Sequence, residues 1–308
     1  MTMQIITDIT EYDKIPCAAT IGSFDGVHLG HLAMLGELRA AASSKGLPLM
    51  VVTFAIHPRR LFDKECAPFL LTPLSEKVKL LEAAGVDICV LLNFDCAMAA
   101  LSAERFMKEI LVERLGVQLL AVGYDHHFGK PTAAEGLEQY IAMGERLGIE
   151  VFGTHPFVID GVAVSSSAVR RALSSGDVAL AARLLGRNYL LQGTVVHGAG
   201  IGHVLGFPTA NISQADNEQM LPLDGVYETD VTVDGKLFKG VMNIGVKPTV
   251  SGKERTNEVH IIDFDGNIYD DDIAVQFVRR LRGEQSFDSV NALRFQIEVD
   301  VARVKRGI

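Results

Sequence analysis

The first part of the chain, residues 1–186, alternates two kinds of segment. Short apolar runs, each long enough for one buried strand, are separated by longer stretches in which apolar residues recur at helical spacing. Buried strands that alternate with helices predict an α/β domain, in which a mostly parallel sheet is covered by helices on both faces. The runs that predict strands are CAATIG, LPLMVVTF, ICVLLNF, LLAVGYD and IEVFGTH, beginning at Cys17, Leu47, Ile88, Leu119 and Ile149.

Three stretches between these runs carry signals of helix ends. Thr72 to Glu76 and Ser102 to Glu104 have capping spacing, with an acidic residue in the first turn. Each stretch closes near a glycine, which can end a helix in the left-handed conformation. The predicted helices are HLAMLGELRAAASSKG, TPLSEKVKLLEAAG and SAERFMKEILVERLG, closing near Gly46, Gly85 and Gly116.

From about Gly193 the pattern changes to strand-like runs rich in β-branched residues. Asp234-Gly235 and Asp265-Gly266 lie between such runs, and Asp-Gly is typical of hairpin turns. These features predict a small antiparallel β-barrel or sandwich. The runs are QGTVVHG, GVYETDVTVDGKLFKGVMNIG and EVHIIDFDGNIYDDDIAVQFVRRL.

The last stretch returns to helical periodicity. Its apolar residues fall on one face of a helix, which we expect to close the second domain. They are Phe287, Val290, Leu293, Ile297 and Val301.

Length and composition fit two globular domains. The chain has 308 residues, 48% hydrophobic and 22% charged. We expect the boundary near LGRNYLLQG, which gives domains of residues 1–186 and 187–308. A net charge of −9 leaves no broad basic face for nucleic acid. A small anionic substrate needs only a local pocket of amides and cations, so such substrates stay possible.

The sequence also bears on the compartment. MTMQIITDIT has neither a cationic start nor an apolar stretch typical of a signal peptide. The longest apolar runs fall well short of the roughly 20 residues that cross a bilayer. The four cysteines form no Cys-x-x-Cys pair. We therefore expect a reduced, cytoplasmic protein with no membrane partner, and the oligomeric state stays open.

The stretch GSFDGVHLGH directly follows the first predicted strand. Gly22 and Gly26 let the backbone turn sharply, and His28 and His31 share a helix face. Two imidazoles at a helix N-terminus form a donor cluster suited to phosphate, as phosphoryl or nucleotidyl transfer requires. Two alternatives stay open: a local cap with a core histidine, and a metal site.

Two further segments carry candidate chemistry. SSSAVRRAL places hydroxyls at a helix N-terminus beside Arg170, which suits phosphate but also fits a simple capped helix. VLGFPTANIS offers Thr209 and Asn211 as hard oxygen ligands for Mg²⁺, or else an Asn-capped turn. Glu258 gives no signal of its own, because a lone strand glutamate is more often a solvated residue.

These segments together resemble the bacterial bifunctional riboflavin kinase/FAD synthetases. GSFDGVHLGH is similar to that family's form of the nucleotidylyltransferase His-x-Gly-His signature, and SSSAVRRAL to its Ser-Ser-Thr-x-Ile-Arg segment. GFPTAN resembles the riboflavin kinase motif. The resemblance runs in family order from about Cys17 to Asp300, and includes VTFAIHPRR, LTPLSEKVKLL, GYDHHFGK, GVMNIGVKPTV and NEVHIIDFDGNIYDDDIAVQF.

The resemblance implies a Rossmann-like nucleotidylyltransferase domain followed by a β-barrel riboflavin kinase domain with a C-terminal helix. Riboflavin would be phosphorylated by ATP to FMN, and FMN would be adenylylated by a second ATP to FAD and pyrophosphate, with Mg²⁺ as cofactor. Implied as catalytic are His28, His31, Arg170 and Glu258, and as metal ligands Thr209 and Asn211. Implied as cofactor-binding are Gly22, Phe24, Asp25, Gly26, Asp125, Ser165, Ser166, Ser167, Gly198, Gly206, Pro208, Thr209, Asn211 and Asn243.

The sequence departs from the family pattern at several loop positions. GYDHHFGK has His126 and His127 where the family carries Phe and Arg, and a histidine is a weaker, pH-dependent phosphate ligand. The kinase loop has His203 where an arginine is common, although it stays glycine-rich. The remaining departures are Ala134, Ser167, Ala199 and the YDD of Tyr269 to Asp271.

Two other functions are therefore kept as alternatives. One is a riboflavin kinase whose altered loop no longer supports adenylylation. The other is a flavin-binding sensor or storage protein without turnover, although binding alone requires no base such as Glu258.

Overall fold

The computed structural model describes residues 2–56, 70–124, 136–198, 200–216, 218–249 and 252–307. The chain forms two compact units. The first comprises residues 1–67 and 72–165, and the second residues 68–71 and 166–308. The boundary expected between residues 186 and 187 concerns the division of function, and it stays a prediction.

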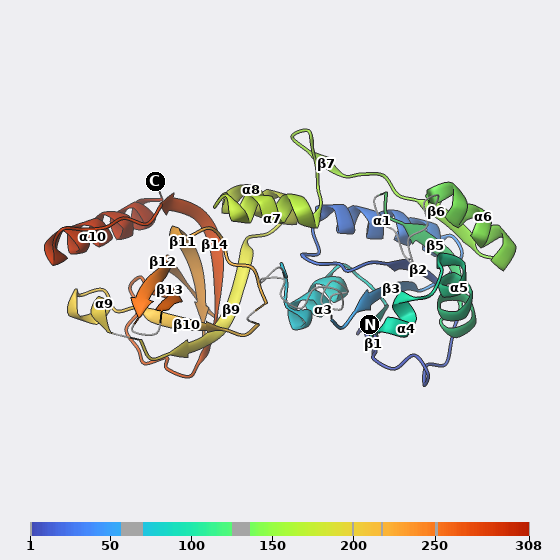
Figure 1. Ribbon diagram of the computed structural model, residues 1–308, viewed down its shortest axis with the longest axis horizontal. Helices are drawn as coiled ribbons and strands as arrows, with labels where there is room; N and C mark the ends of the chain where they lie inside the picture. The colour runs from blue at the N-terminus through green and yellow to red at the C-terminus, as the bar shows by residue number, and fades with distance from the viewer. Residues whose placement is uncertain are drawn as a thin grey trace. The chain divides into compact units, whose positions relative to one another are not determined.

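The first unit is built on a six-stranded parallel sheet, as the sequence predicts (Figure 1). All five predicted strands are present. The sixth, β1, is a three-residue edge strand that pairs with β4 and is too short for a periodic signal. The order is β1-β4-β3-β2-β5-β6, with β1 at Gln4–Ile6, β2 at Cys17–Ile21, β3 at Leu49–Phe54, β4 at Ile88–Leu92, β5 at Val117–Val122 and β6 at Glu150–Gly153.

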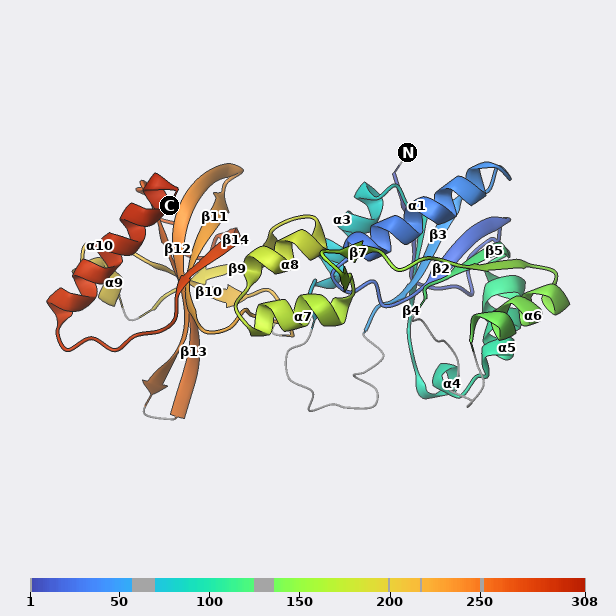
Figure 2. The ribbon, with the colours of Figure 1, turned by 90° about the horizontal axis from the view of Figure 1, so that it is seen from above.

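Helices cover both faces of this sheet (Figure 2). Successive strand residues point to opposite faces, so Ala18 packs in one core and Cys17 in the other. The first core holds Leu38 and Leu81 from α1 and α3, and the second holds Leu111. The helices are α1 (Leu29–Ser43), α3 (Leu74–Ala83), α4 (Cys96–Ala99), α5 (Ala103–Arg105), the π-helix η1 (Phe106–Arg114) and α6 (Leu137–Leu147).

The helix ends follow the sequence signals with one exception. Ser102 caps α5, its hydroxyl accepting the Arg105 N–H at 3.3 Å. Thr72 does not cap α3, because the helix begins one residue later and Pro73 precedes it. The predicted closing glycines Gly46, Gly85 and Gly116 have φ of 66°, 80° and 76°, the left-handed conformation expected of them.

The second unit is a closed six-stranded antiparallel barrel (Figure 1). The sequence predicts either a barrel or a sandwich. Because the sheet closes on itself, the structure is a barrel. Its strand order is β10-β13-β12-β11-β14-β9, with β9 at Tyr189–Val196, β10 at Ala210–Gln214, β11 at Gly225–Val233, β12 at Lys236–Thr249, β13 at Gly252–Ile261 and β14 at Asp272–Arg282. The other elements are β7 (Val158–Ile159) and β8 (Val162–Ala163) in the first unit, and α7 (Ser166–Ser174), α8 (Val178–Leu185), α9 (Ile201–Val204) and α10 (Val290–Arg306) in the second.

Only one of the two predicted hairpin turns is a hairpin. Asp234 and Gly235, with φ of 48° and 73°, join β11 to β12, where Val233 pairs with Lys236. The prediction for Asp265-Gly266 was wrong. These residues lie between β13 and β14, which are not neighbours in the barrel, so the segment connects strands that do not pair.

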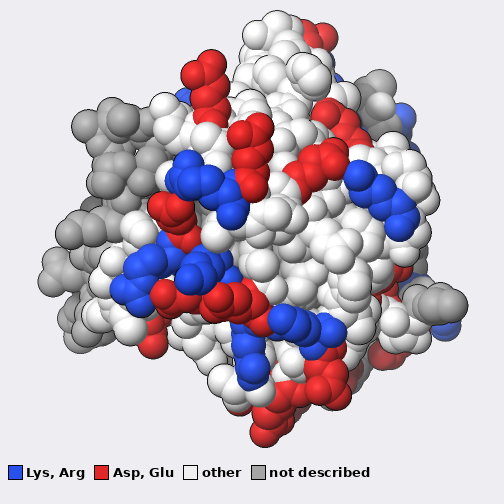
Figure 3. All heavy atoms as spheres, turned by 90° about the vertical axis from the view of Figure 1, so that its right-hand side faces the viewer, with Lys and Arg blue, Asp and Glu red and all other residues white. Residues whose placement is uncertain are grey.

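The signs of charge are mixed on the surface. Arg146 pairs with Glu104, and Arg105 with Glu109. Figure 3 shows the same interspersion of acidic and basic side chains over one face of the first unit. In the described part of the chain, no helix combines the length and apolarity needed to cross a membrane.

Helix α10 is fixed to the barrel by a buried ion pair. Asp300 is 1% exposed, and its carboxylate accepts from Arg282 Nε at 2.9 Å and from Gln296 Nε2 at 3.0 Å. Two residues of the predicted helix face differ from expectation: Phe287 precedes the helix, which Ser289 caps, and Val290 is exposed.

We expect Asp300→Ala to lower the free energy of unfolding of the second unit by about 3–5 kcal/mol, because it leaves the Arg282 charge buried and unpaired. Urea denaturation of the full chain, followed by circular dichroism, measures the change. Glu298→Ala on the same helix is the control, because its pair with Arg294 is exposed and contributes about 0–1 kcal/mol. Equal effects of the two substitutions would contradict the prediction.

Candidate active sites

The first candidate site lies at the carboxyl end of β2. This strand sits between β3 and β5, where the chain order of the sheet reverses. Ligands of open parallel sheets bind at such a switch point, outside the carboxyl ends of the strands. The loop of Gly22 to Val27 therefore occupies the position where a nucleotide is expected, with α1 beginning directly after it.

His28 and His31 lie face to face at the start of α1. Their ring centroids are 3.6 Å apart and the planes meet at 14°. His28 is the N-cap, and its Nδ1 accepts the His31 backbone N–H at 3.2 Å. A neutral imidazole that accepts at Nδ1 carries its proton on Nε2, so His28 offers Nε2–H as a donor. The helix dipole adds positive potential at the same point.

This arrangement argues against the metal alternative for the two histidines. Stacked rings do not converge on one ion, and Nδ1 of His28 is already engaged. Among the described residues, no group of three or more His, Cys, Asp or Glu side chains could hold a metal ion. The donor pair suits an anion better than a cation.

Gly30 makes the close packing around His28 possible. A Cβ atom there would lie 2.8 Å from the Val164 carbonyl oxygen and 3.1 Å from His28 Nδ1. Any larger side chain would therefore displace the histidine or the backbone at Val164. Gly30 is the glycine of the His-x-Gly-His pattern. This pattern is the sequence feature that points to the need for a glycine here.

The predicted loop residues Gly22, Phe24, Asp25 and Gly26 are all buried. The Phe24 ring lies 4.8 Å from the His31 ring, and the Asp25 carboxylate accepts the Thr72 N–H at 3.2 Å. These two side chains thus shape the site from within the fold. Their contact with a nucleotide stays a prediction.

Five further residues are predicted for the adenylylation site. Asp125, with His126 and His127, follows β5 and lies outside the described residues. Ser165 is the last residue of the first unit. Ser166, Ser167 and Arg170 belong to the second unit, in the first turns of α7. The predicted hydroxyls do therefore stand at a helix N-terminus.

The second candidate site is a row of three polar residues across the barrel. On β13, Glu258 pairs with Asn211 of β10 on one side and with Asn243 of β12 on the other. Directly opposed residues share a face of the sheet. Met242 and Val259, the strand neighbours, are fully buried in the barrel, so the row points outward.

The glycine-rich loop packs closely against this row. A Cβ atom on Gly198 would overlap the Asn211 side-chain amide, and one on Gly202 would lie 3.0 Å from Thr209 Oγ1. Thr209 Oγ1 in turn lies 3.5 Å from Glu258 Oε2. The loop backbone thus approaches both predicted metal ligands.

Two residues of the row, Glu258 and Asn243, line a cavity of about 330 Å³, a size usual for small-molecule sites. The barrel forms one wall, and α10 with the preceding segment forms the other. The polar lining also includes Thr209, Glu284, Gln285 and the Arg282–Asp300 pair. The apolar side chains of the lining would suit a flat aromatic ligand. They are Leu205, Phe207, Val226, Val241, Phe287, Leu293 and Ile297.

Four residues predicted for this site, Gly198, Gly206, Pro208 and Asn211, do not line the cavity. Gly206 is exposed and has a φ of 85°, so it turns the loop. The Pro208 carbonyl lies 2.8 Å from Nδ1 of His260, whose ring is edge-on to Phe207. His260, which lines the cavity, was not predicted, because a strand histidine gives no sequence signal of its own.

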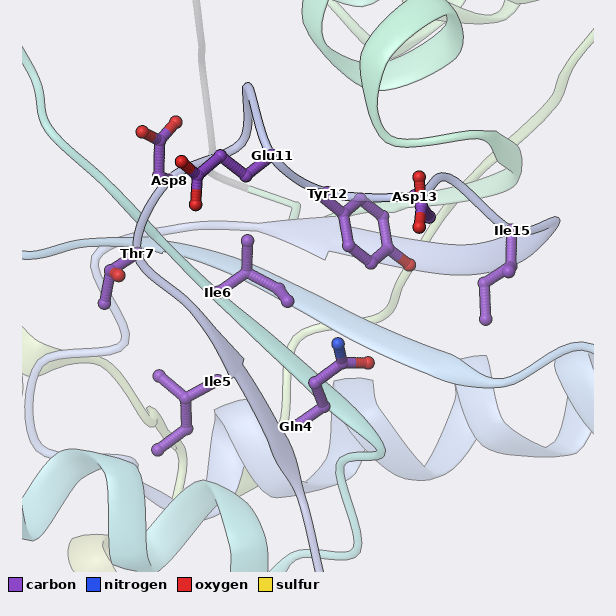
Figure 4. Close-up of a pocket in the computed structure, with 9 residues that line it drawn as sticks. All are labelled: Gln4, Ile5, Ile6, Thr7, Asp8, Glu11, Tyr12, Asp13 and Ile15. Atoms are coloured by element: carbon purple, nitrogen blue, oxygen red, sulfur yellow. The ribbon is translucent and has the colours of Figure 1, made fainter.

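A second cavity, of about 360 Å³, lies beside β1 (Figure 4). Asp8, Glu11 and Asp13 line it, together with Tyr12. Strands β4 and β3 separate β1 from β2, so this cavity is distinct from the histidine site. Three carboxylates would repel a phosphate, which excludes it as the nucleotide site.

Comparison with known proteins assigns a family to each half of the chain. A family model described as FAD synthetase matches residues 10–168, and one described as riboflavin kinase matches residues 185–308. A solved structure from Streptococcus pneumoniae, described as a macrolide-efflux protein, is 28% identical with a TM-score of 0.88. The match covers 99% of each chain.

Two similar proteins are described as bifunctional riboflavin kinase/FMN adenylyltransferases. The one from Haemophilus influenzae is 39% identical over 98% of each chain. The one from Escherichia coli K12 is 40% identical over 97% of this chain and 96% of its own. Since both family models match and the identity extends over nearly the full length, the chain belongs to the family of bifunctional riboflavin kinase/FMN adenylyltransferases, enzymes that make FMN and FAD.

Proposed function

We propose that the two reactions of this family are divided between the two candidate sites. The barrel site phosphorylates riboflavin, and the site after β2 adenylylates the FMN that results. The observation that carries the proposal is the row of Asn211, Glu258 and Asn243, because Glu258 and Asn243 line a cavity whose other lining is largely apolar. It combines a carboxylate with a pocket for a flat ring system.

In the kinase reaction the isoalloxazine ring of riboflavin lies in the apolar part of the cavity. Glu258 accepts the proton of the ribityl 5′-hydroxyl as its oxygen bonds to the γ-phosphorus of ATP. The bond from that phosphorus to the β,γ-bridging oxygen breaks, and ADP leaves. Gly198 and Gly206 belong to the loop that lies along the phosphates.

The residues around Glu258 also suit Mg²⁺. This ion takes few protein ligands, all hard oxygens, alongside phosphate and water. Thr209 and Asn211 supply a hydroxyl and an amide oxygen next to Gly202 and Gly198 of the loop. When bound, the ion would neutralise charge on the phosphates.

In the adenylylation an oxygen of the FMN phosphate bonds to the α-phosphorus of ATP, and the bond to pyrophosphate breaks. His28 and His31 donate to the oxygens on which charge develops. Ser166, Ser167 and Arg170 bind phosphate at the start of α7. Asp125 and Ser165 line the nucleotide site in this proposal.

We place the enzyme in the cytoplasm, where ATP is supplied and thiols stay reduced. Burial raises the pKa of Cys17 to about 12 and that of Cys89 to about 11, so both remain neutral and unreactive thiols. Its partners are then the small molecules riboflavin, FMN and ATP, without nucleic acid.

We expect the purified chain, given riboflavin, ATP and Mg²⁺, to form FMN first and then convert it to FAD, because one product is the other's substrate. Chromatography of the flavins over time measures both steps. FMN that accumulates without FAD would point to a kinase with a degraded second site, and bound flavin without turnover to a binding protein.

Replacing both histidines, as His28→Ala/His31→Ala, should lower FAD formation from FMN at least 10²–10³-fold, because it removes the donors to the transition state. FMN formation from riboflavin should persist, which makes the kinase reaction an internal control in the same chain. A parallel loss of both activities would contradict the assignment of these residues.

Glu258→Gln should give the opposite result. FMN formation should fall about 10²–10⁴-fold, because the glutamine cannot accept the hydroxyl proton. FAD formation from added FMN should continue at the wild-type rate. Initial rates with riboflavin and with FMN, measured separately, distinguish the two reactions. An unchanged kinase rate would remove Glu258 as the base.

A further inference from the structure

The loop between β2 and α1 is held in an unfavourable backbone conformation. Phe24 and Val27 have φ of 48° and 37°, and Gly26 has φ of 88°. A positive φ is uncommon for residues other than glycine, and it is a clear outlier for a β-branched residue such as Val27. Such strain persists only where surrounding contacts impose it.

Those contacts meet at the carbonyl group of Ser23, the residue before the strained segment. Its oxygen accepts from Thr53 Oγ1 at 3.1 Å and from Lys77 Nζ at 3.2 Å. Thr53 lies in β3, and Lys77 projects from α3. The loop is thus tied at one atom to two neighbouring elements.

Lys77 is an unusual lysine because it is only 8% exposed. Besides Ser23, its ammonium group donates to the Phe54 carbonyl at 3.1 Å and to Thr53 Oγ1 at 3.4 Å. An ammonium group has three protons, so these three bonds use its donor capacity. Lys77 therefore joins the ends of β2 and β3 and has no donor to spare for a substrate.

Asp25, which is 3% exposed, compensates the buried charge. Burial lowers the pKa of Lys77, and attraction to Asp25 opposes that shift. Asp25 also accepts the Thr72 N–H at 3.2 Å, next to the start of α3. The Lys77 ammonium group, the Asp25 carboxylate and the Thr53 hydroxyl are thus buried polar groups that interact with one another and with the backbone of the loop.

We propose that Lys77 is a positioning residue for adenylyl transfer: by holding the Ser23 carbonyl it fixes the loop of Phe24 to Val27, and through it the stacked pair of His28 and His31. This inference rests on the proposed function of the histidine site. Phe24 transmits the constraint, because its buried ring lies against His31. Displacement of a reacting group by about 1 Å can slow a reaction about 10²-fold.

The test is Lys77→Met, which keeps the chain length and removes all three hydrogen bonds. We expect kcat for FAD formation from FMN to fall about 10²-fold, with the KM for ATP changed little. The kinase rate of the same chain should be unchanged. Lys79→Met is the matched control, because Lys79 lies on the same helix but is exposed, and it should leave both activities unaltered.

A purely structural role would give a different result. Lys77→Met would then lower the melting temperature while kcat per folded molecule stayed at the wild-type value. Proton NMR of the histidine rings gives a second measurement. We expect the ring-current shifts of the stacked imidazoles to change in Lys77→Met and not in Lys79→Met. Unchanged kcat or unchanged shifts in the folded variant would overturn the proposal.

Thr53→Val decides the question should Lys77→Met not fold. It removes one donor to Ser23 and one of the three acceptors of Lys77, while the ammonium group keeps its bonds to the Ser23 and Phe54 carbonyls. We expect the same selective fall in kcat, by a smaller factor. Equal kcat in Thr53→Val and wild type would overturn the proposal. A wild-type chain that makes no FAD from FMN would instead remove the proposed function itself, which separates the two failures.

Discussion

Strand pairing, by its register in the barrel and its order in the parallel sheet, is the constraint from which both candidate sites follow. In the barrel, antiparallel pairing sets Glu258 opposite Asn211 and Asn243, so three polar groups far apart in sequence share one face. In the parallel sheet, the position of β2 between β3 and β5 brings the loop after β2 to the switch point. A shift of one residue in β13 would turn Glu258 into the barrel and Val259 outward.

Close backbone approach is the second feature that the two sites share. Gly30 lets the Val164 carbonyl and the His28 ring meet, and Gly198 lets its loop lie on the Asn211 amide. In each case the glycine is needed for space rather than for a positive φ, which the structure records for neither residue. Phosphate sites commonly use such backbone, because N–H groups must come near the anion.

Local sequence patterns predicted the helices and strands well. They failed where the structure depends on contacts between residues distant in sequence. The apolar run at Cys17 and the helix after it could be predicted because strand and helix periods are local. The turn at Asp265-Gly266 could not, since strand order in a barrel depends on contacts distant in sequence. The histidines were predicted from spacing, but their stacking arises because His28 is the cap rather than a helical residue. Lys77 was missed because a helical lysine is normally exposed, and only the meeting of the Ser23 and Phe54 carbonyls accounts for its burial.

The difference between the two sites follows from the difference between the two nucleophiles. Riboflavin attacks through an alcohol, which keeps its proton at neutral pH and needs a base, and in our proposal Glu258 of the barrel is that base. FMN attacks through a phosphate oxygen that is already ionised, so the first unit needs donors and no base. Its carboxylate, Asp25, accordingly faces the Thr72 N–H and the buried Lys77 charge rather than serving as a base, and in our proposal the histidines are donors to the reacting groups. The protonation state of each nucleophile thus accounts for which side chains its site contains.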